Sequence, residues 1–253
     1  MNVKMGELKT LEICEKRYQL DKIGIVTEKD RHYYMSIAIK EVLKEILLLD
    51  SKNLELAIRL NKVYEKLDEL IDDGLFLPLA KGEELKILTE QVERYIRYIK
   101  GLGIKVLAKD VVQDVNINGK LITVSADFVY EHSNGVIEVV KIKRTPPKLS
   151  YRARKFENMP KNNIELYLLQ SMGEHLYTNK PVTASFHHLA GKDDKKTFNP
   201  VYNHKKGYNV INYYFKGDDI ENVEKQVVEL VRKTESNKFY RTDNSSDCRV
   251  CPY

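Results

Sequence analysis

The feature that most constrains the fold is a β-hairpin pattern in the middle of the chain. Two runs rich in β-branched and apolar residues, 120–130 and 136–143, are joined across Asn134-Gly135. Asn-Gly between two such runs is the strongest short hairpin signal, because both residues accept the positive φ of a tight turn. A third run, 105–117, precedes them across Asn118-Gly119. The sequence therefore predicts a three-stranded antiparallel meander.

Charged side chains interrupt this apolar hairpin at defined positions. Asp127 lies in the first of its two strands, and Lys141 and Lys143 lie at the end of the second. A strictly two-residue turn at Asn134-Gly135 would place Asp127 on the face of Ile142. Asp127 can therefore face the lysines only if the loop has three residues or the hairpin contains a bulge.

Alternation along the middle strand predicts which of its side chains share a face. Five apolar residues at every second position are expected on one side: Ile122, Val124, Ala126, Phe128 and Tyr130. Asp127 belongs to the other set, so we expect it to point away from the main apolar layer.

Helical patterns lie on both sides of the meander. Before it, apolar residues recur at steps of three and four in segments near 7–19, 32–49, 53–72 and 83–100. After it come a helix near 162–178, strands near 182–190 and 208–215, and a helix near 219–233. We therefore expect one α/β domain over 1–253. A helical subdomain, 30–100, is inserted before an αβββαβ core, 104–235, and a cysteine-containing tail, 236–253, follows the core.

Composition indicates a globular protein in the cytoplasm. Of the 253 residues, 42% are hydrophobic and 31% are charged, which is typical of globular domains rather than disordered chains. No apolar run approaches the roughly 18 residues that span a bilayer. The first residues also lack the apolar stretch of a signal peptide. We expect no membrane partner.

Basic residues gather after the hairpin. The net charge is only +5, which permits a nucleic-acid partner without requiring one. The basic residues of the cluster are Lys141, Lys143, Arg144, Lys148, Arg152 and Arg154, with Tyr151 among them. Cations interleaved with aromatic rings are typical of surfaces that contact both phosphates and bases. A solvated loop is the other interpretation of the same segment.

Three features in different parts of the chain, taken together, resemble a known nuclease family. They are Leu11-x-x-Cys14-x-x-x-Tyr18, the hairpin from Asp127 to Lys143, and the terminal Asp247-Cys-Arg-Val-Cys-Pro-Tyr253. Their order and spacing resemble the RecB-like branch of the PD-(D/E)XK nucleases, which includes the AddB nuclease domain and the CRISPR-associated adaptation nucleases. The resemblance implies a restriction-endonuclease-like αβββαβ core.

The resemblance also implies a set of catalytic residues. Active members hold one or two divalent metals with a histidine on an early helix and two carboxylates, and a lysine steadies the developing charge or orients the water. Carboxylates serve because magnesium and manganese prefer hard oxygen ligands. Asp127 and Lys143 match two of these positions. Lys141 stands where the family has its second acid, and Lys40 stands where it has histidine.

These two exchanges are expected to abolish metal binding unless another acid replaces the lost ligand. At about 4 Å and an effective dielectric of about 20, each pair of unit charges is worth roughly 4 kcal/mol. Lys141 would then form a salt bridge with Asp127. Glu138 is a poor replacement, because strand parity points it to the opposite face from Lys141. Glu165, on the following helix, is better placed, and with Asp127 and Lys143 it would complete a magnesium or manganese site.

The three cysteines lack the fourth ligand that a cluster usually needs. In the family that this chain resembles, four cysteines hold a four-iron, four-sulfur cluster that joins the chain ends. This chain supplies Cys14, Cys248 and Cys251. An iron–sulfur cluster with an outside ligand, zinc bound with a histidine such as His204, and unliganded thiols all remain open. Disulfides are not expected without a secretory signal.

The sequence as a whole predicts a DNA-binding nuclease-like protein with a degenerate metal site. Such a protein would act in DNA repair or recombination as an accessory to a helicase or to another subunit of a nuclease complex. One alternative is an active magnesium- or manganese-dependent DNA exonuclease. The other is a protein–protein scaffold that binds no nucleic acid.

Overall fold

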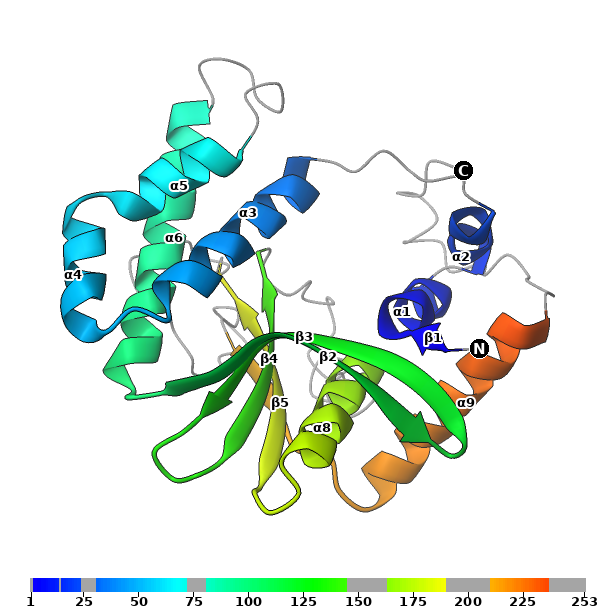
Figure 1. Cartoon of the computed structure of the whole chain (residues 1–253). Coiled ribbons are helices and arrows are strands. Elements are labelled where there is room, and N and C mark those ends of the chain that lie inside the picture. The colour runs from blue at the N-terminus through cyan, green and yellow to red at the C-terminus, as the bar shows by residue number, and fades with distance from the viewer. Residues whose placement is uncertain are drawn as a thin grey trace, which may run out of the picture.

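The computed structural model describes residues 2–13, 15–23, 31–71, 81–144, 163–189 and 210–236. These residues form an α/β fold with a mixed six-stranded sheet and helices on both of its faces (Figure 1). In this described part of the chain, no helix is long and apolar enough to cross a membrane.

From the helix expected near 32–49 onward, the elements follow the predicted order. The chain begins with β1 (Val3–Lys4), which was not predicted, and the helix expected near 7–19 corresponds to α1 (Met5–Ile13) and α2 (Glu15–Lys22). The helical segment contains α3 (Arg31–Ile46), α4 (Ser51–Arg59), α5 (Lys62–Leu70) and α6 (Lys81–Gly101). The meander is β2 (Lys105–Ile117), β3 (Lys120–Glu131) and β4 (Ile137–Lys143). Then follow α8 (Ile164–Leu176), β5 (Val182–His188), β6 (Val210–Tyr213) and α9 (Asp218–Ser236).

The single helix expected near 53–72 is two helices. Asn61 separates α4 from α5 and has a left-handed backbone, with φ of 58°. Asparagine adopts this conformation more readily than most residues, so the chain can turn there although the apolar spacing continues through it. Periodicity alone therefore missed the break.

β3 pairs with three other strands of the sheet, β1, β2 and β4. β2 pairs with it antiparallel along its whole length. β1 pairs parallel with the beginning of β3, at Ile122 and Thr123, and β4 pairs antiparallel with its end, from Phe128 to Glu131. The sheet continues through β5, which is parallel to β4, to the antiparallel β6. The end of β4 thus lies at the centre of the fold.

Both Asn-Gly pairs form the turns that the sequence predicts. Asn118 and Gly119 have φ values of 49° and 79° and make a two-residue loop between Ile117 and Lys120. The β3–β4 loop instead has three residues, 133–135, closed by a hydrogen bond of 3.0 Å from the His132 N–H to the Val136 carbonyl. The loop thus has the three residues that Asp127 needs in order to face Lys141.

The prediction that five apolar residues of β3 share one face is wrong. Ile122, Val124 and Ala126 pack with α1, α8 and α9, whereas Phe128 and Tyr130 pack with α3 to α6. The alternation therefore changes phase beside Asp127. β2 is irregular over the same stretch, with a register shift between Val106 and Ala108 and a φ of 50° at Asp110. Such irregularities re-aim side chains near them.

Two hydrophobic cores hold the helices to the sheet. The helices α3 to α6 share one core with four residues of the sheet: Phe128, Tyr130, Val140 and Ile142. The helices α1, α8 and α9 pack on the other core. At Gly173 in α8, an added Cβ would lie 2.5 Å from Val182 Cγ1 and 2.6 Å from Val139 Cγ2, so the helix approaches the sheet closely there. These cores fix α3, α1 and α8 around the end of β4.

Candidate functional site

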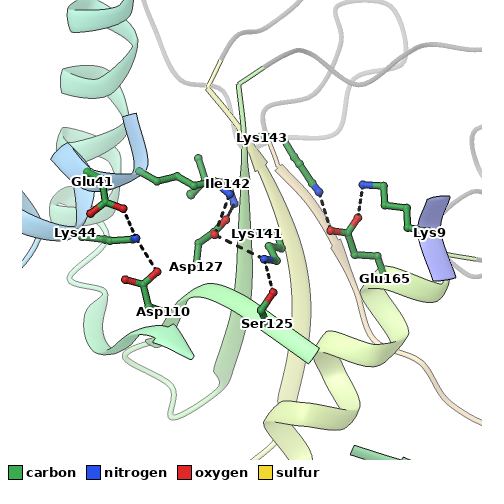
Figure 2. Close-up of polar contacts among 11 residues, drawn as sticks. Lys9, Glu41, Lys44, Asp110, Ser125, Asp127, Lys141, Ile142, Lys143 and Glu165 are labelled. Atoms are coloured by element: carbon green, nitrogen blue, oxygen red, sulfur yellow. Dashed lines mark hydrogen bonds and ion pairs between the residues drawn. The ribbon is translucent and has the colours of Figure 1, made fainter. Parts of the chain in front are cut away.

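The candidate site lies where β4 separates from β3. Their described backbone ladder ends at the pair Phe128 and Val140, while β4 stays paired with β5 as far as Lys143. Beyond this point the Ile142 N–H donates a hydrogen bond of 2.7 Å to Asp127 Oδ2. The Asp127 carboxylate thus accepts the bond that a β3 carbonyl would otherwise accept, and it occupies the fork between the strands (Figure 2).

Two lysines approach the other oxygen of Asp127. Lys40 Nζ, from α3, donates a hydrogen bond of 3.0 Å to Oδ1, and Lys141 Nζ, from β4, lies 3.8 Å from the same atom. Lys141 also donates to Ser125 Oγ at 3.1 Å (Figure 2). The Asp127 side chain is only 8% exposed, so these contacts supply most of its surroundings. The lysines at the expected histidine and second-acid positions both face Asp127.

A second buried carboxylate, Glu165, is also bound by two lysines. Glu165 lies in the first turn of α8, which begins at an Asn163 cap whose side chain accepts the Leu166 N–H. Lys143 Nζ is 2.8 Å from Oε1, and Lys9 Nζ, from α1, is 2.8 Å from Oε2 (Figure 2). Burial alone would raise the pKa of Glu165, but the two ammonium groups lower it to about 2. Glu165 is therefore ionised at neutral pH.

The lysines themselves are held in a partly dehydrated environment. Burial lowers the pKa of Lys143 to about 8, although Glu165 opposes that change. Lys143 Nζ also lies 4.6 Å from the centre of the Phe186 ring, a cation–π distance. Burial lowers the pKa of Lys141 as well, and repulsion from Lys40 adds to the effect. These four cations (Lys9, Lys40, Lys141 and Lys143) are called the lysine cluster below.

Helix α3 contacts the sheet through a further ion pair that the sequence did not suggest. Lys44, one turn after Lys40, is 2.7 Å from Asp110 Oδ1 and 2.6 Å from Glu41 Oε1 (Figure 2). Asp110 lies opposite Asp127 in the β2–β3 ladder, because the flanking residues pair directly. Two successive turns of α3 thus each place a lysine on an aspartate of the sheet.

Glu138 takes no part in this group, as strand parity predicts. Its side chain is 4% exposed and contacts His132 Nε2 at 2.7 Å and His187 Nε2 at 3.1 Å, and it accepts a hydrogen bond from Ser185. His187 in turn contacts the Tyr95 hydroxyl at 2.8 Å. This polar network connects β4 and β5 to Tyr95 of α6.

Apart from Lys40, the predicted DNA contacts and the cysteines lie outside the group around Asp127 and Glu165 or outside the described residues. Arg144, a predicted DNA contact, is 3.4 Å from Glu84 on α6 and its side chain is 14% exposed. Lys40, also a predicted DNA contact, bonds Asp127. The other predicted DNA contacts and the cysteines fall outside the described residues: Lys148, Tyr151, Arg152, Arg154, Cys14, Cys248 and Cys251.

Lys9 and Ser125 are site residues that sequence reasoning missed. Lys9 and Glu165 are 156 positions apart, so no local spacing links them. Alternation did place Ser125 on the face of Asp127, and that pattern was the available signal.

The described residues do not fit a divalent cation in this arrangement. Magnesium and manganese require several oxygen ligands with free lone pairs. One oxygen of Asp127 faces two ammonium groups and the other accepts a backbone N–H, while each oxygen of Glu165 bonds a lysine. A dication placed there would also be repelled by the lysine cluster.

Comparison with known proteins supports the fold alone. No family model and no curated protein matches the chain. Among solved structures, a predicted exonuclease from Eubacterium rectale matches 100% of this chain and 88% of its own, with a TM-score of 0.53 and 11% identity. The match to the structure of SSO0001 covers 89% of this chain and 86% of that chain at 11% identity, but its TM-score of 0.30 is too low to indicate a shared fold. The chain therefore has a nuclease-like α/β fold.

Proposed function

We propose that this protein is a DNA-binding member of the RecB-like branch of the PD-(D/E)XK nucleases that has lost metal-dependent cleavage. The observation that carries this proposal is the pairing of Lys40 and Lys141 with Asp127. In an active site of this type, the same carboxylate would bind the metal that activates water. Here the positive charge beside Asp127 comes from the protein itself.

The proposed partner is DNA because the region around the fork is cationic. The side chains of Lys40 and Lys143 are each about a quarter exposed. Further basic residues follow β4 in the sequence. Lysines bind phosphates through charge and hydrogen bonds without needing a metal. A protein that binds DNA without cutting it would serve as an accessory to a helicase or to another subunit of a DNA-processing complex.

The rival function is a magnesium- or manganese-dependent exonuclease. The observation that favours it is the presence of two buried carboxylates, Asp127 and Glu165, on either side of Lys141 and Lys143. Metal binding would then require the lysines to leave both carboxylates. A scaffold that binds no nucleic acid is the third candidate.

Cleavage and binding assays separate the three candidates. Labelled single- and double-stranded DNA is incubated with the protein in magnesium or manganese, and binding is followed by fluorescence anisotropy at increasing salt. We expect binding that weakens steeply with salt and no cleavage. Metal-dependent cutting that disappears in Asp127→Ala would establish the exonuclease. A protein that binds neither form of DNA at low salt would be the scaffold.

We also propose that Cys14, Cys248 and Cys251 bind a metal or an iron–sulfur cluster together. Support comes from the residue that follows Cys14. Glu15 Oε1 is 2.9 Å from Lys233 Nζ, so this residue lies beside the last turns of α9, the helix that precedes Cys248 in the sequence. Iron and zinc are measured in anaerobically purified protein. Cys14→Ser and Cys251→Ser should lower the metal content equally, and a metal content that neither change affects contradicts the proposal.

A further inference from the structure

We infer that the lysine cluster is a metal-independent oxyanion site, in which the buried carboxylates of Asp127 and Glu165 hold the ammonium groups in place and limit their affinity for a phosphate. The inference rests on the proposed function only in taking DNA as the source of the phosphate. Its central consequence is the direction in which removal of a carboxylate charge changes the affinity for phosphate. Neutralising either carboxylate should strengthen phosphate binding, whereas in a metal site the same change weakens it.

The first argument is the charge of the cluster. Within the described residues, Lys40 and Lys141 lie 3.0 and 3.8 Å from Asp127, and Lys9 and Lys143 each lie 2.8 Å from Glu165. Two ammonium groups therefore contact each of these two carboxylates. These ion pairs alone bring together more positive than negative charge, which favours an incoming anion.

The second argument is the supply of hydrogen-bond donors. A lysine ammonium has three N–H groups and no acceptor. Within the described residues, Lys40 donates one to Asp127 and Lys143 donates one to Glu165, at 3.0 and 2.8 Å. Ammonium–phosphate hydrogen bonds have the same lengths as these ammonium–carboxylate bonds. The cluster therefore has hydrogen-bond donors of the kind that bind an oxyanion.

The third argument is the order of the groups from solvent inward. The side chains of Lys9, Lys40 and Lys143 are 42%, 26% and 25% exposed. Those of Asp127 and Glu165 are 8% and 9% exposed. The lysine side chains are thus more accessible to an anion from solvent than the carboxylates are. The buried carboxylates neutralise part of the cationic charge and limit the affinity for an incoming anion.

The test uses pyrophosphate and inorganic phosphate as probes, with a chelator present to remove divalent metals. Binding to the full chain is measured by isothermal titration calorimetry. We expect Asp127→Asn and Glu165→Gln to lower the dissociation constant of pyrophosphate on the order of tenfold, because each change removes one nearby negative charge. Lys40→Gln and Lys141→Gln should raise it by a similar factor.

A matched ion pair elsewhere provides the control. Lys120 and Glu235 are 2.8 Å apart and their side chains are 31% and 55% exposed, away from the cluster. Lys120→Gln and Glu235→Gln make the same charge changes and should leave pyrophosphate binding unaltered. Because Asp127 is buried, thermal melts accompany each variant, and the lysine variants and Glu165→Gln decide the question if Asp127→Asn fails to fold.

DNA binding to the same variants separates this inference from the proposed function. If pyrophosphate binds with the expected signs and DNA does not bind, the oxyanion site stands and the proposed function fails. If DNA binds but neither the cluster variants nor added pyrophosphate alter its affinity, the inference is wrong and the proposed function survives. Weaker pyrophosphate binding in Asp127→Asn and in Glu165→Gln, or binding that requires manganese, also overturns the inference.

Discussion

Lys40 Nζ lies 3.0 Å from Asp127 Oδ1, although 87 positions separate the two residues in the chain. The contact joins a helix of the first hundred residues to the centre of the sheet. It also places a fixed monovalent cation beside the carboxylate that, by the resemblance, would hold a metal. This pair therefore links the packing of α3 to the chemistry of the fork, and it suggests how the site can be altered.

Restoring the two family residues should restore a metal site. We expect the double variant Lys40→His with Lys141→Glu to bind manganese, because it replaces two ammonium groups beside Asp127 with an imidazole and a carboxylate. Calorimetry measures the binding, and labelled DNA reports cleavage. Adding Asp127→Ala to the double variant is the control and should remove both. A double variant that folds but binds no manganese contradicts the charge argument.

Removing the Asp127 carboxylate should destabilise the fold. Asp127→Ala leaves the buried Ile142 N–H without its acceptor and leaves two ammonium groups facing each other. We expect a loss of about 3 kcal/mol in the free energy of unfolding, measured with urea. Glu235→Ala breaks an exposed pair and should cost less than about 1 kcal/mol. Equal losses in the two variants would show that Asp127 contributes no special stability.

Gly173→Ala should also destabilise the protein, although alanine favours helices. The new methyl group would lie 2.5 Å from Val182 Cγ1 and 2.6 Å from Val139 Cγ2, so α8 or the strands must move. Such overpacking typically costs about 1–3 kcal/mol, which outweighs a gain of up to about 1 kcal/mol in helix propensity. Gly82→Ala, with no atom within 4 Å of the new methyl, should be neutral or stabilising. Adding Val182→Ala should recover part of the loss in Gly173→Ala.

Stability should depend on pH through His132. Its hydrogen bond to Glu138 raises the pKa of His132 above 6.5, and Glu138 stays ionised because its own pKa is lowered. A raised pKa in the folded state stabilises the fold below the unfolded value, and this contribution is lost as pH rises through the folded pKa. Thermal melts should therefore show the advantage of wild type over His132→Gln below pH 6.5 and its decline above. A difference independent of pH would assign the effect to packing.

Local patterns in the sequence were enough to predict the meander and its loops. Positive φ occurs at Asn118, Gly119 and Gly135, where Asn-Gly pairs predict turns. Strand parity then determines that Asp127 can meet Lys141 only across an odd loop. These inferences succeed because turn chemistry and alternation act between near neighbours. The helix α8 and the strands β5 and β6 after it were predicted from the same kind of local pattern.

Other features of the site depend on contacts that no local pattern encodes. Lys9 reaches Glu165 because α1 packs against α8, and Lys44 reaches Asp110 because α3 crosses the sheet. The apolar side chains of β3 change from one face of the sheet to the other beside Asp127, where the neighbouring strand β2 is irregular. The sequence of β3 alone could not predict this change. The short strand β1 forms only because β3 offers it an edge to pair with.

The pairing of β3 with β4 has a consequence for where this hairpin can change length. A residue gained or lost within the loop 133–135 leaves the strand pairs outside the loop unchanged, so Lys141 still faces Asp127. A residue removed from β4 between Ile137 and Lys141 shifts the strand by one position and brings Ile142 opposite Asp127, because side chains alternate along a strand. Length can therefore vary at the tip of the hairpin, whereas one deletion in β4 exchanges an ammonium group for a hydrocarbon side chain beside Asp127.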